Sequence, residues 1–411
     1  MAIDIRRKDD FRKLWAGQTI SALGSRITRE GLPLTAVIVL KATALQMSVL
    51  SAIGSASVLF FSLGAGIIAD RFRRRSIMIA ADLGRAALLS MVPALALLHR
   101  LSIIHLIVIS ALAGVLSVLF DVAYQSYLPS LVAPGQLLEG NRLLALSEAT
   151  AEVLGPSLTG VLVQLITAPL AVLLDAISFV ISALSLTSIG TREPGPQPAK
   201  AVSARQEIWE GIAAVLSHPA LRPLFFRSIV AYLSLGPFLS FYMLYSIRTL
   251  HLSPASLGVL IALGGVGSLA GASLAPRISK HSPMQALFFS ALVMALAMFL
   301  VPLASISSSF TILCLAAQQL VGDCAWTVSI VNETTLRQTA VPSNLLGRVN
   351  ASAQLASRGI LPVGALASGF LAKSLGIVPA LWIGATGVLI SSLCLIPLLF
   401  RGARNQPRAS R

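Results

Sequence analysis

Charged residues are scarce in this 411-residue chain: they make up 11% of it, whereas hydrophobic residues make up 55%. A soluble domain carries about 25% charged residues. The composition therefore excludes an ordinary soluble protein and predicts one whose apolar side chains are covered by lipid. The formal net charge of +15 does not indicate nucleic-acid binding, because the basic residues lie in short blocks between apolar runs.

Residues that form metal sites and disulfides are also few. The chain has three cysteines and five histidines. The cysteines lie inside apolar segments without CxxC or CxxH spacing, which is typical of small buried side chains. The histidines lie at the ends of apolar runs or in loops. We therefore expect no metal site, no cofactor and no enzyme activity, since no nucleophile–base set is visible at membrane depth.

Long apolar runs account for most of the sequence. A helix needs about 20 residues to cross the hydrocarbon core, and only helices are expected there because each backbone polar group must pair within its own segment. The first run is too long for a signal peptide. We predict twelve spans, at approximately 14–40, 45–69, 76–98, 101–126, 139–166, 169–190, 221–249, 254–276, 282–304, 307–333, 346–373 and 376–400.

Lysines and arginines indicate the orientation of these spans. They are concentrated in the segments on the side of the two termini, and such an excess marks the cytoplasmic face. We expect an all-α, multi-pass protein of the plasma (inner) membrane with both termini in the cytoplasm.

The longest polar break divides the chain into two six-helix halves. It begins with a Pro/Gly-rich linker, and Ile208, Ile212 and Val215 then recur at helical spacing, which predicts a short amphipathic helix. The predicted parts are an N-terminal segment 1–13, a bundle 14–190, the linker 191–220, a bundle 221–400 and a basic tail 401–411.

The two halves share an internal repeat in their fifth spans. Residues of the first half recur at one constant offset in the second, and a parallel duplication of six helices with a site between the halves is a transporter architecture. The pairs are Asn141 with Asn350, Gly155 with Gly364, and Gly160 with Gly369.

The loop after the second span resembles a known signature. GIIADRFRRR, residues 66–75, is similar to the G-x-x-x-D-R-x-G-R-R loop of the major facilitator superfamily. Stretches at 80–86, 120–132, 173–184 and 210–222 resemble its enterobactin-exporter-like and macrolide-efflux-like permeases. In EVLGPSLTGV, residues Gly155, Pro156 and Gly160 match an antiporter motif of the fifth helix. The resemblance implies the twelve-helix fold of that superfamily.

The resemblance also implies a conformational latch at the cytoplasmic side. It places the loop against the N-terminus of the eleventh span, where the helix dipole favours an anion. Such a latch holds the halves in one state and breaks in the other. The alternative is that loop arginines only obey the positive-inside rule, which we favour for Arg73 and Arg75. The predicted latch residues are Gly66, Asp70, Arg71, Arg74, Asp82, Arg85 and Asp121.

Polar residues recur on one face of several spans, and a sustained polar face meets protein or water rather than lipid. In helical projection, Arg29 lies on the polar stripe of the first span, and Glu148 and Glu152 share a stripe of the fifth. Two interpretations stay open: hydrogen bonds between helices or a wet substrate cavity. Glu152 is the candidate proton carrier, with an ion pair to Arg358 or Arg29 as its alternative.

Other candidates come from spans one, seven and ten. Arg26 and Glu30 are four residues apart, where an ion pair can form, and Gly236-Pro237 predicts a kink. Aromatic residues of spans seven and ten suit a planar or amphipathic ligand, although plain packing gives the same pattern. The predicted pathway residues are Arg29, Glu30, Glu148, Glu152, Phe238, Phe241, Tyr245, Asp323, Trp326 and Arg358.

These features predict a proton-coupled exporter of a small amphipathic compound, siderophore-like or antibiotic-like, that works by alternating access. The expected partners are the lipid bilayer, a small-molecule substrate and protons, with the protein a monomer. An uptake symporter or uniporter is the alternative. A non-transporting sensor would need a soluble output domain, and no loop of this chain is long enough for one.

Overall fold

The computed structural model is helical wherever it has regular structure, which confirms the predicted all-α class, and no strand occurs in its described part. Some side chains within helices lie outside the description, among them those of residues 62–67, 69–71 and 204–210. The described residues are 9–132, 134–191, 204–280, 282–341, 343–397 and 399.

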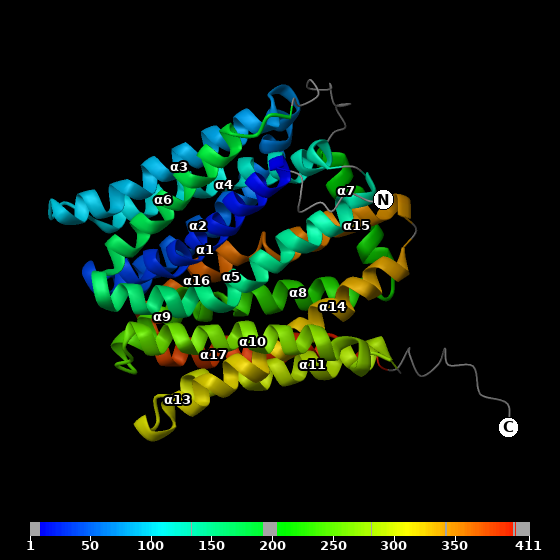
Figure 1. Ribbon diagram of the computed structural model, residues 1–411. Helices are drawn as coiled ribbons and strands as arrows, with labels where there is room; N and C mark the ends of the chain where they lie inside the picture. The colour runs from blue at the N-terminus through cyan, green and yellow to red at the C-terminus, as the bar shows by residue number, and fades with distance from the viewer. Residues whose placement is uncertain are drawn as a thin grey trace. The chain divides into compact units, whose positions relative to one another are not determined.

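The first compact unit comprises residues 1–201 and 251–262. In it α6 packs along α1 and α3, α4 packs along α2 and α3, and α5 packs along α1 (Figure 1). Its helices are α1 (Asp9–Leu34), the π-helical η2 (Thr35–Val39), α2 (Ala44–Arg71), α3 (Arg74–Leu97), α4 (Ile103–Leu131), η3 (Pro134–Gln136), α5 (Leu137–Ile166) and α6 (Ala168–Thr187).

The second compact unit comprises residues 202–250 and 263–411, so α10 begins in the first unit and continues in the second. Its helices are α7 (Ala204–Ser217), α8 (Leu221–Ser234), α9 (Gly236–Arg248), α10 (Pro254–Ile278), α11 (Pro283–Met298), α12 (Leu300–Leu303), α13 (Ser308–Ala317), the π-helical η4 (Gln318–Gly322), α14 (Asp323–Ala340), α15 (Ser343–Ser357), α16 (Leu361–Leu375) and α17 (Ile377–Leu393).

Every predicted span coincides with helix, but the number that crosses the membrane stays a prediction. Within the described part, nine helices are long and apolar enough to cross, and α17 is a shorter apolar helix. α1 is not among the nine, because Arg26, Arg29 and Glu30 interrupt its apolar stretch.

Three predicted spans of the second unit are broken into shorter helices, between α8 and α9, between α11 and α12, and between α15 and α16. The break between α8 and α9 falls at the Gly236-Pro237 pair, as predicted, since proline cannot donate a backbone hydrogen bond. Another break separates α15 from α16. This break and the one between α8 and α9 lie close together, because a Cβ on Gly236 would come within 2.2 Å of the carbonyl oxygen of Gly364. Glycine permits this approach of two backbones.

The predicted amphipathic helix of the linker is α7, and it belongs to the second unit. Val215 is buried, and a Cβ on Gly211 would come within 2.4 Å of the carbonyl oxygen of Arg348 in α15. α7 therefore packs against the start of the eleventh predicted span. Residues 192–203 of the linker and the tail 401–411 lie outside the described residues.

Basic side chains cap the C-terminal end of α6. Arg75 donates to the carbonyl oxygens of Leu186 and Thr187 at 2.8 and 2.5 Å, and Lys13 donates to that of Ser188 at 2.8 Å. The last turn of a helix leaves such carbonyls unpaired and carries a partial negative charge. Arg75 therefore stabilises the C-terminal end of α6, in addition to placing a positive charge on the face of the membrane where that end lies.

Asp10 connects the start of α1 to the chain that follows α6. Its carboxylate accepts hydrogen bonds from the Thr191 hydroxyl at 2.6 Å and from the backbone N–H groups of Thr191 and Gly190 at 2.9 and 3.2 Å. These donors, the Thr191 hydroxyl foremost, lower the pKa of Asp10 from 3.8 to about 2, because they stabilise the charged carboxylate.

Asp10→Asn is expected to lower the free energy of unfolding at neutral pH by about 1–2 kcal/mol. The folded-state pKa lies below the ordinary value, so the contribution is full above about pH 4 and is lost as the pH falls toward about 2. Unfolding of the wild type and of Asp10→Asn in detergent, between neutral pH and about pH 3, measures this difference in the free energy of unfolding. Equal loss from Asp9→Asn, whose side chain is exposed, would contradict the assignment.

Candidate functional site

A charged site lies on α1 and α5 within the first unit. Glu152, near the middle of α5, forms an ion pair with Arg26 of α1, and its other carboxylate oxygen lies 3.9 Å from Nη1 of Arg29. Glu152 therefore faces two guanidinium groups. Arg29 is one of the two ion-pair partners that the sequence predicted for Glu152 as an alternative. Arg26 forms its close ion pair with a carboxylate of α5, which the spacing within α1 does not reveal, while Glu30 interacts electrostatically with both Arg29 and Arg26.

Exposure separates the two arginines. The Arg26 side chain is 17% exposed and lies against Gly155, where a Cβ would come within 2.5 Å of the Arg26 Cβ. The side chains of Arg29 and Glu152 are 63% and 47% exposed. Charged groups at this depth are costly against lipid. The face around Arg29 and Glu152 is therefore expected to meet protein or water rather than lipid.

The antiporter-like residues follow Glu152 on α5. A Cβ on Gly160 would come within 2.3 Å of the carbonyl oxygen of Pro254, and one on Gly258 within 2.3 Å of that of Pro156. Residues 251–262 belong to the first unit. Small residues therefore let α5 and the first turns of α10 approach to backbone distance, as is common in membrane helices.

The other predicted acids of the first unit differ in their surroundings. Glu30 is half-buried, and among the described side chains no cation lies within 4.0 Å of it. Glu148 is exposed one turn before Glu152, and Asp121 is exposed on α4. Both carboxylates act electrostatically on Tyr124 of α4, so each lies in its surroundings within the first unit.

Asp82 and Arg85 belong to a separate buried cluster inside the first unit. They pair with each other one turn apart on α3. The Arg85 guanidinium donates to the Ser117 hydroxyl at 3.2 Å and lies over the rings of Phe120 and Phe179, 4.6 and 4.0 Å from their centroids. The sequence grouped these two residues with the latch, whereas the structure encloses them between α3, α4 and α6.

The remaining latch residues lie at the junction of α2 and α3. The side chains of Gly66, Asp70 and Arg71 are outside the described part of the chain. Arg74 begins α3, and Arg74 and Asp121 both take part in interactions. The latch therefore stays a prediction.

The predicted aromatic residues of the seventh span are packed into the protein. Phe238, Phe241 and Tyr245 of α9 are buried, and the Tyr245 hydroxyl donates to the carbonyl oxygen of Val301 at 3.0 Å. Their packing matches the alternative that the sequence left open. Trp326 on α14 is only half-buried, and its ring meets that of Tyr232 at 5.7 Å between centroids.

Asp323 and Arg358 lie at irregular positions in the second unit. Asp323 begins α14 directly after the π-helical η4, and a Cβ on Gly264 of α10 would come within 2.1 Å of its Oδ2. Arg358 is exposed in the break between α15 and α16. Irregular helix segments of this kind are frequent at functional sites.

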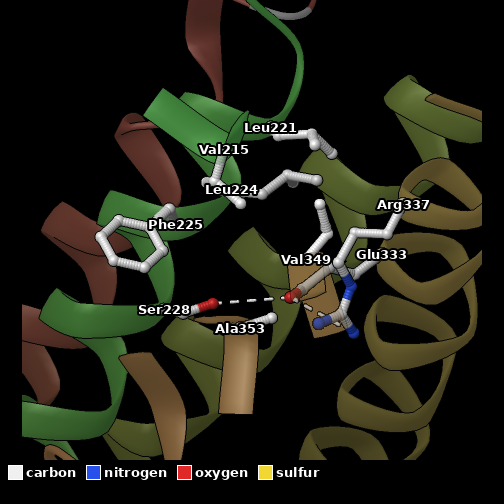
Figure 2. Close-up of a pocket in the computed structure, with 9 residues that line it drawn as sticks. All are labelled: Val215, Leu221, Leu224, Phe225, Ser228, Glu333, Arg337, Val349 and Ala353. Carbon is white, nitrogen blue, oxygen red and sulfur yellow. Dashed lines mark hydrogen bonds and ion pairs between the residues drawn. The ribbon is translucent and has the colours of Figure 1, made fainter. Parts of the chain in front are cut away.

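A buried ion pair joins α8 and α14 in the second unit. Nη1 of Arg227 lies 2.5 Å from Oε2 of Glu333, and Nη2 donates to the Ser329 hydroxyl at 2.8 Å. The adjacent pocket (Figure 2) has room for about one water molecule. It is too small for a substrate, and it is lined by Val215, Leu221, Leu224, Phe225, Ser228, Glu333, Arg337, Val349 and Ala353.

Sequence reasoning missed Asp175 and the pairing of Arg227 with Glu333. Asp175 is the one ionisable residue of α6, and a lone acid in an apolar span is by default a candidate functional residue. That signal would have found Asp175. Arg227 and Glu333 lie on stripes of different spans, and their contact depends on how α8 and α14 pack.

Known proteins resemble the chain along nearly its whole length. The family model described as transmembrane secretion effector matches residues 5–409. The uncharacterized MFS-type transporter YfiS of Bacillus subtilis (strain 168) is 26% identical over 381 residues, which are 90% of this chain and 89% of that protein.

Solved transporter structures share the fold. A bacterial homologue of the iron transporter ferroportin, in its inward-facing state, has a TM-score of 0.77 at 18% identity, over 96% of this chain and 99% of that one. The nucleoside transporter NupG has a TM-score of 0.73 at 12% identity, over 97% and 100% of the two chains. Identities this low show the fold alone.

The sequence matches and the shared fold agree with each other. They identify a membrane transporter rather than an enzyme, and they do not distinguish the enterobactin-like or macrolide-like branch from others. The chain belongs to the transmembrane secretion effector family of the MFS transporters, the major facilitator superfamily.

Proposed function

We propose that the protein is a secondary active exporter of the inner membrane, with both termini cytoplasmic, that moves a small amphipathic compound by alternating access. The observation that carries the proposal is the exposed, charged face formed by Arg29 and Glu152 within the spans of the first unit. Charge at this depth is retained where it serves a pathway. The family description, which speaks of secretion, supports the outward direction.

The charges of this face suit a substrate that carries an anionic group. Arg29 is mostly exposed and only 3.9 Å from Glu152, so its guanidinium is loosely held. A carboxylate or catecholate of the substrate competes with Glu152 for it, because arginine binds planar anions through two donors. Arg26, packed on Gly155, keeps Glu152 in place during the exchange.

The substrate class follows from this chemistry. A siderophore-like or antibiotic-like molecule combines an anionic or polar group with an apolar, planar body. Protons drive the export, since acids in membrane spans exchange protons when their surroundings change. The latch at the junction of α2 and α3 holds one of the two access states.

Transport into everted membrane vesicles tests direction and coupling together. The probes are 2,3-dihydroxybenzoate, a small aromatic anion of siderophore chemistry, and erythromycin, a cationic antibiotic. With an acidic lumen we expect the anion to accumulate against its gradient and a protonophore to abolish the accumulation. Accumulation only in right-side-out vesicles would identify an uptake symporter. Equilibration without accumulation would identify a uniporter, and both outcomes contradict the proposal.

A further inference from the structure

Asp175 is a buried carboxyl to which the proposed function gives no role. It is 1% exposed and lies on α6. The backbone of α1 closes over it, because a Cβ on Gly24 would come within 2.6 Å of its Oδ1. Thr28, one turn further along α1, approaches the same carboxyl. The group is therefore enclosed between α1 and α6.

The Ser178 hydroxyl contacts two oxygens of Asp175, and a proton on the carboxyl lets each contact be a full hydrogen bond. The Ser178 hydroxyl lies 2.8 Å from the backbone carbonyl oxygen of Asp175 and 2.9 Å from its Oδ1. A serine hydroxyl has a single hydrogen to donate. If the carboxyl is protonated, it donates to Ser178 while Ser178 donates to the carbonyl, and both contacts are satisfied.

The charge balance of the surrounding cluster leads to the same conclusion. The charged groups that act on Asp175 in the described structure are Arg85 and Asp82 of α3; α1 presents Gly24 and Thr28, and α5 presents no charge to it. Arg85 pairs directly with Asp82, and both are buried. An ionised Asp175 would be a second buried anion without a paired cation, which is strongly unfavourable.

Two atoms of the Asp82–Arg85 pair are available for a second arrangement. Oδ2 of Asp82 and Nε of Arg85 are buried and make no hydrogen bond within 3.5 Å among the described residues, and the Ser182 hydroxyl also approaches the Asp82 carboxyl. Buried polar atoms of this kind are rare and call for an explanation. The guanidinium can turn toward Asp175, and Oδ2 of Asp82 can accept a proton.

We propose that Asp175 and Asp82 hold one proton between them, that it rests on Asp175 in this structure, and that Arg85 moves it by exchanging partners. In the step the O–H bond of Asp175 breaks and an O–H bond forms at Oδ2 of Asp82, while the guanidinium leaves Asp82 for Asp175. The cluster stays neutral throughout. This proton site lies apart from Arg29 and Glu152, so substrate and proton occupy different places in the first unit.

Infrared spectroscopy of the purified full-length protein tests the protonation directly. The wild type is expected to show the C=O stretch of a buried carboxylic acid at neutral pH, shifted in D₂O, and Asp175→Asn is expected to lose it. Asp82→Asn, which leaves the Arg85 guanidinium for Asp175, is expected to lose it as well. A band that persists in Asp175→Asn, or that is missing from the wild type, overturns the assignment.

Stability provides a second readout that a purely structural carboxylate would not give. Asn has nearly the shape and charge of a protonated Asp, so Asp175→Asn is expected to unfold at the wild-type temperature. Asp82→Asn breaks the direct pair with Arg85 and forces the guanidinium to turn to an ionised Asp175, so it is expected to unfold earlier. Equal loss in both variants would mean that Asp175 is ionised and paired, and the inference would fail.

The coupling role rests on the proposed function and has a separate test. In everted vesicles Asp175→Asn is expected to retain exchange of labelled for unlabelled 2,3-dihydroxybenzoate and to lose accumulation driven by the proton gradient. Intact accumulation in this variant, or accumulation that requires Na⁺ instead of an acidic lumen, would overturn the coupling role. Absence of driven accumulation in the wild type would refute the proposed function while the infrared band still decides the proton site.

Discussion

Replacing Glu333 by alanine is expected to lower the free energy of unfolding by about 3–5 kcal/mol. The Arg227 side chain is 6% exposed and its Nη1 lies 2.5 Å from Glu333. Without the carboxylate, a guanidinium charge stays buried between α8 and α14 with the Ser329 hydroxyl as its remaining close partner. Breaking one partner of a buried pair costs more than the pair itself contributes.

Unfolding in mixed micelles of a mild detergent and SDS measures this loss. The control is Arg142→Ala, which breaks the pair of Arg142 with Glu139 at 2.7 Å. Both of those side chains are exposed, and we expect a much smaller effect. The double variant Arg227→Met with Glu333→Leu should recover most of the stability, because it removes both charges together. A loss from Glu333→Ala no larger than from Arg142→Ala would show that the pair is hydrated.

Arg29→Ala is expected to raise the KM for the anionic probe by about 10- to 100-fold, as the loss of a charge-assisted hydrogen bond implies. Its side chain is 63% exposed, so we expect the unfolding temperature to stay unchanged. Arg29→Lys should recover part of the affinity, since it keeps the charge but not the planar fork of donors.

Arg26→Ala is the matched control, because Arg26 faces the same carboxylate from a packed position. Its side chain is 17% exposed and lies against Gly155. We expect this variant to lower the unfolding temperature and to change KM less than Arg29→Ala does. The reverse pattern, with Arg26 controlling KM and Arg29 controlling stability, would show that the substrate-facing arginine has been misassigned.

The helical framework was readable from the sequence because it depends on local properties. Long apolar runs can only be helices in lipid, and the break at Gly236-Pro237 follows from the missing N–H of proline. The break between α15 and α16 has the same cause, because Pro362 at the start of α16 also lacks the N–H that would continue the helix. It lies beside the first break, where Gly236 and Gly364 meet, and this contact is visible only in the folded unit.

The candidate site was readable only in part, because pairing between helices is not local. Helical projection placed Arg29 and Glu152 on polar stripes of their own spans, and the structure brings these stripes together. Spacing within α1 favoured Glu30 as the partner of Arg26, whereas the close approach of α5 at Gly155 gives Arg26 to Glu152. Sequence periodicity also cannot separate packed rings such as Phe241 from rings that face a pathway.

Proton-driven accumulation of 2,3-dihydroxybenzoate in everted vesicles, compared between the wild type and Glu152→Gln at equal amounts of folded protein, tests the role of the Arg29–Glu152 face. We expect accumulation by the wild type with an acidic lumen. We expect Glu152→Gln to lose turnover, because nothing then displaces the substrate anion from Arg29. Wild-type accumulation that Glu152→Gln leaves unchanged would show that the Arg29–Glu152 face is not the transport pathway.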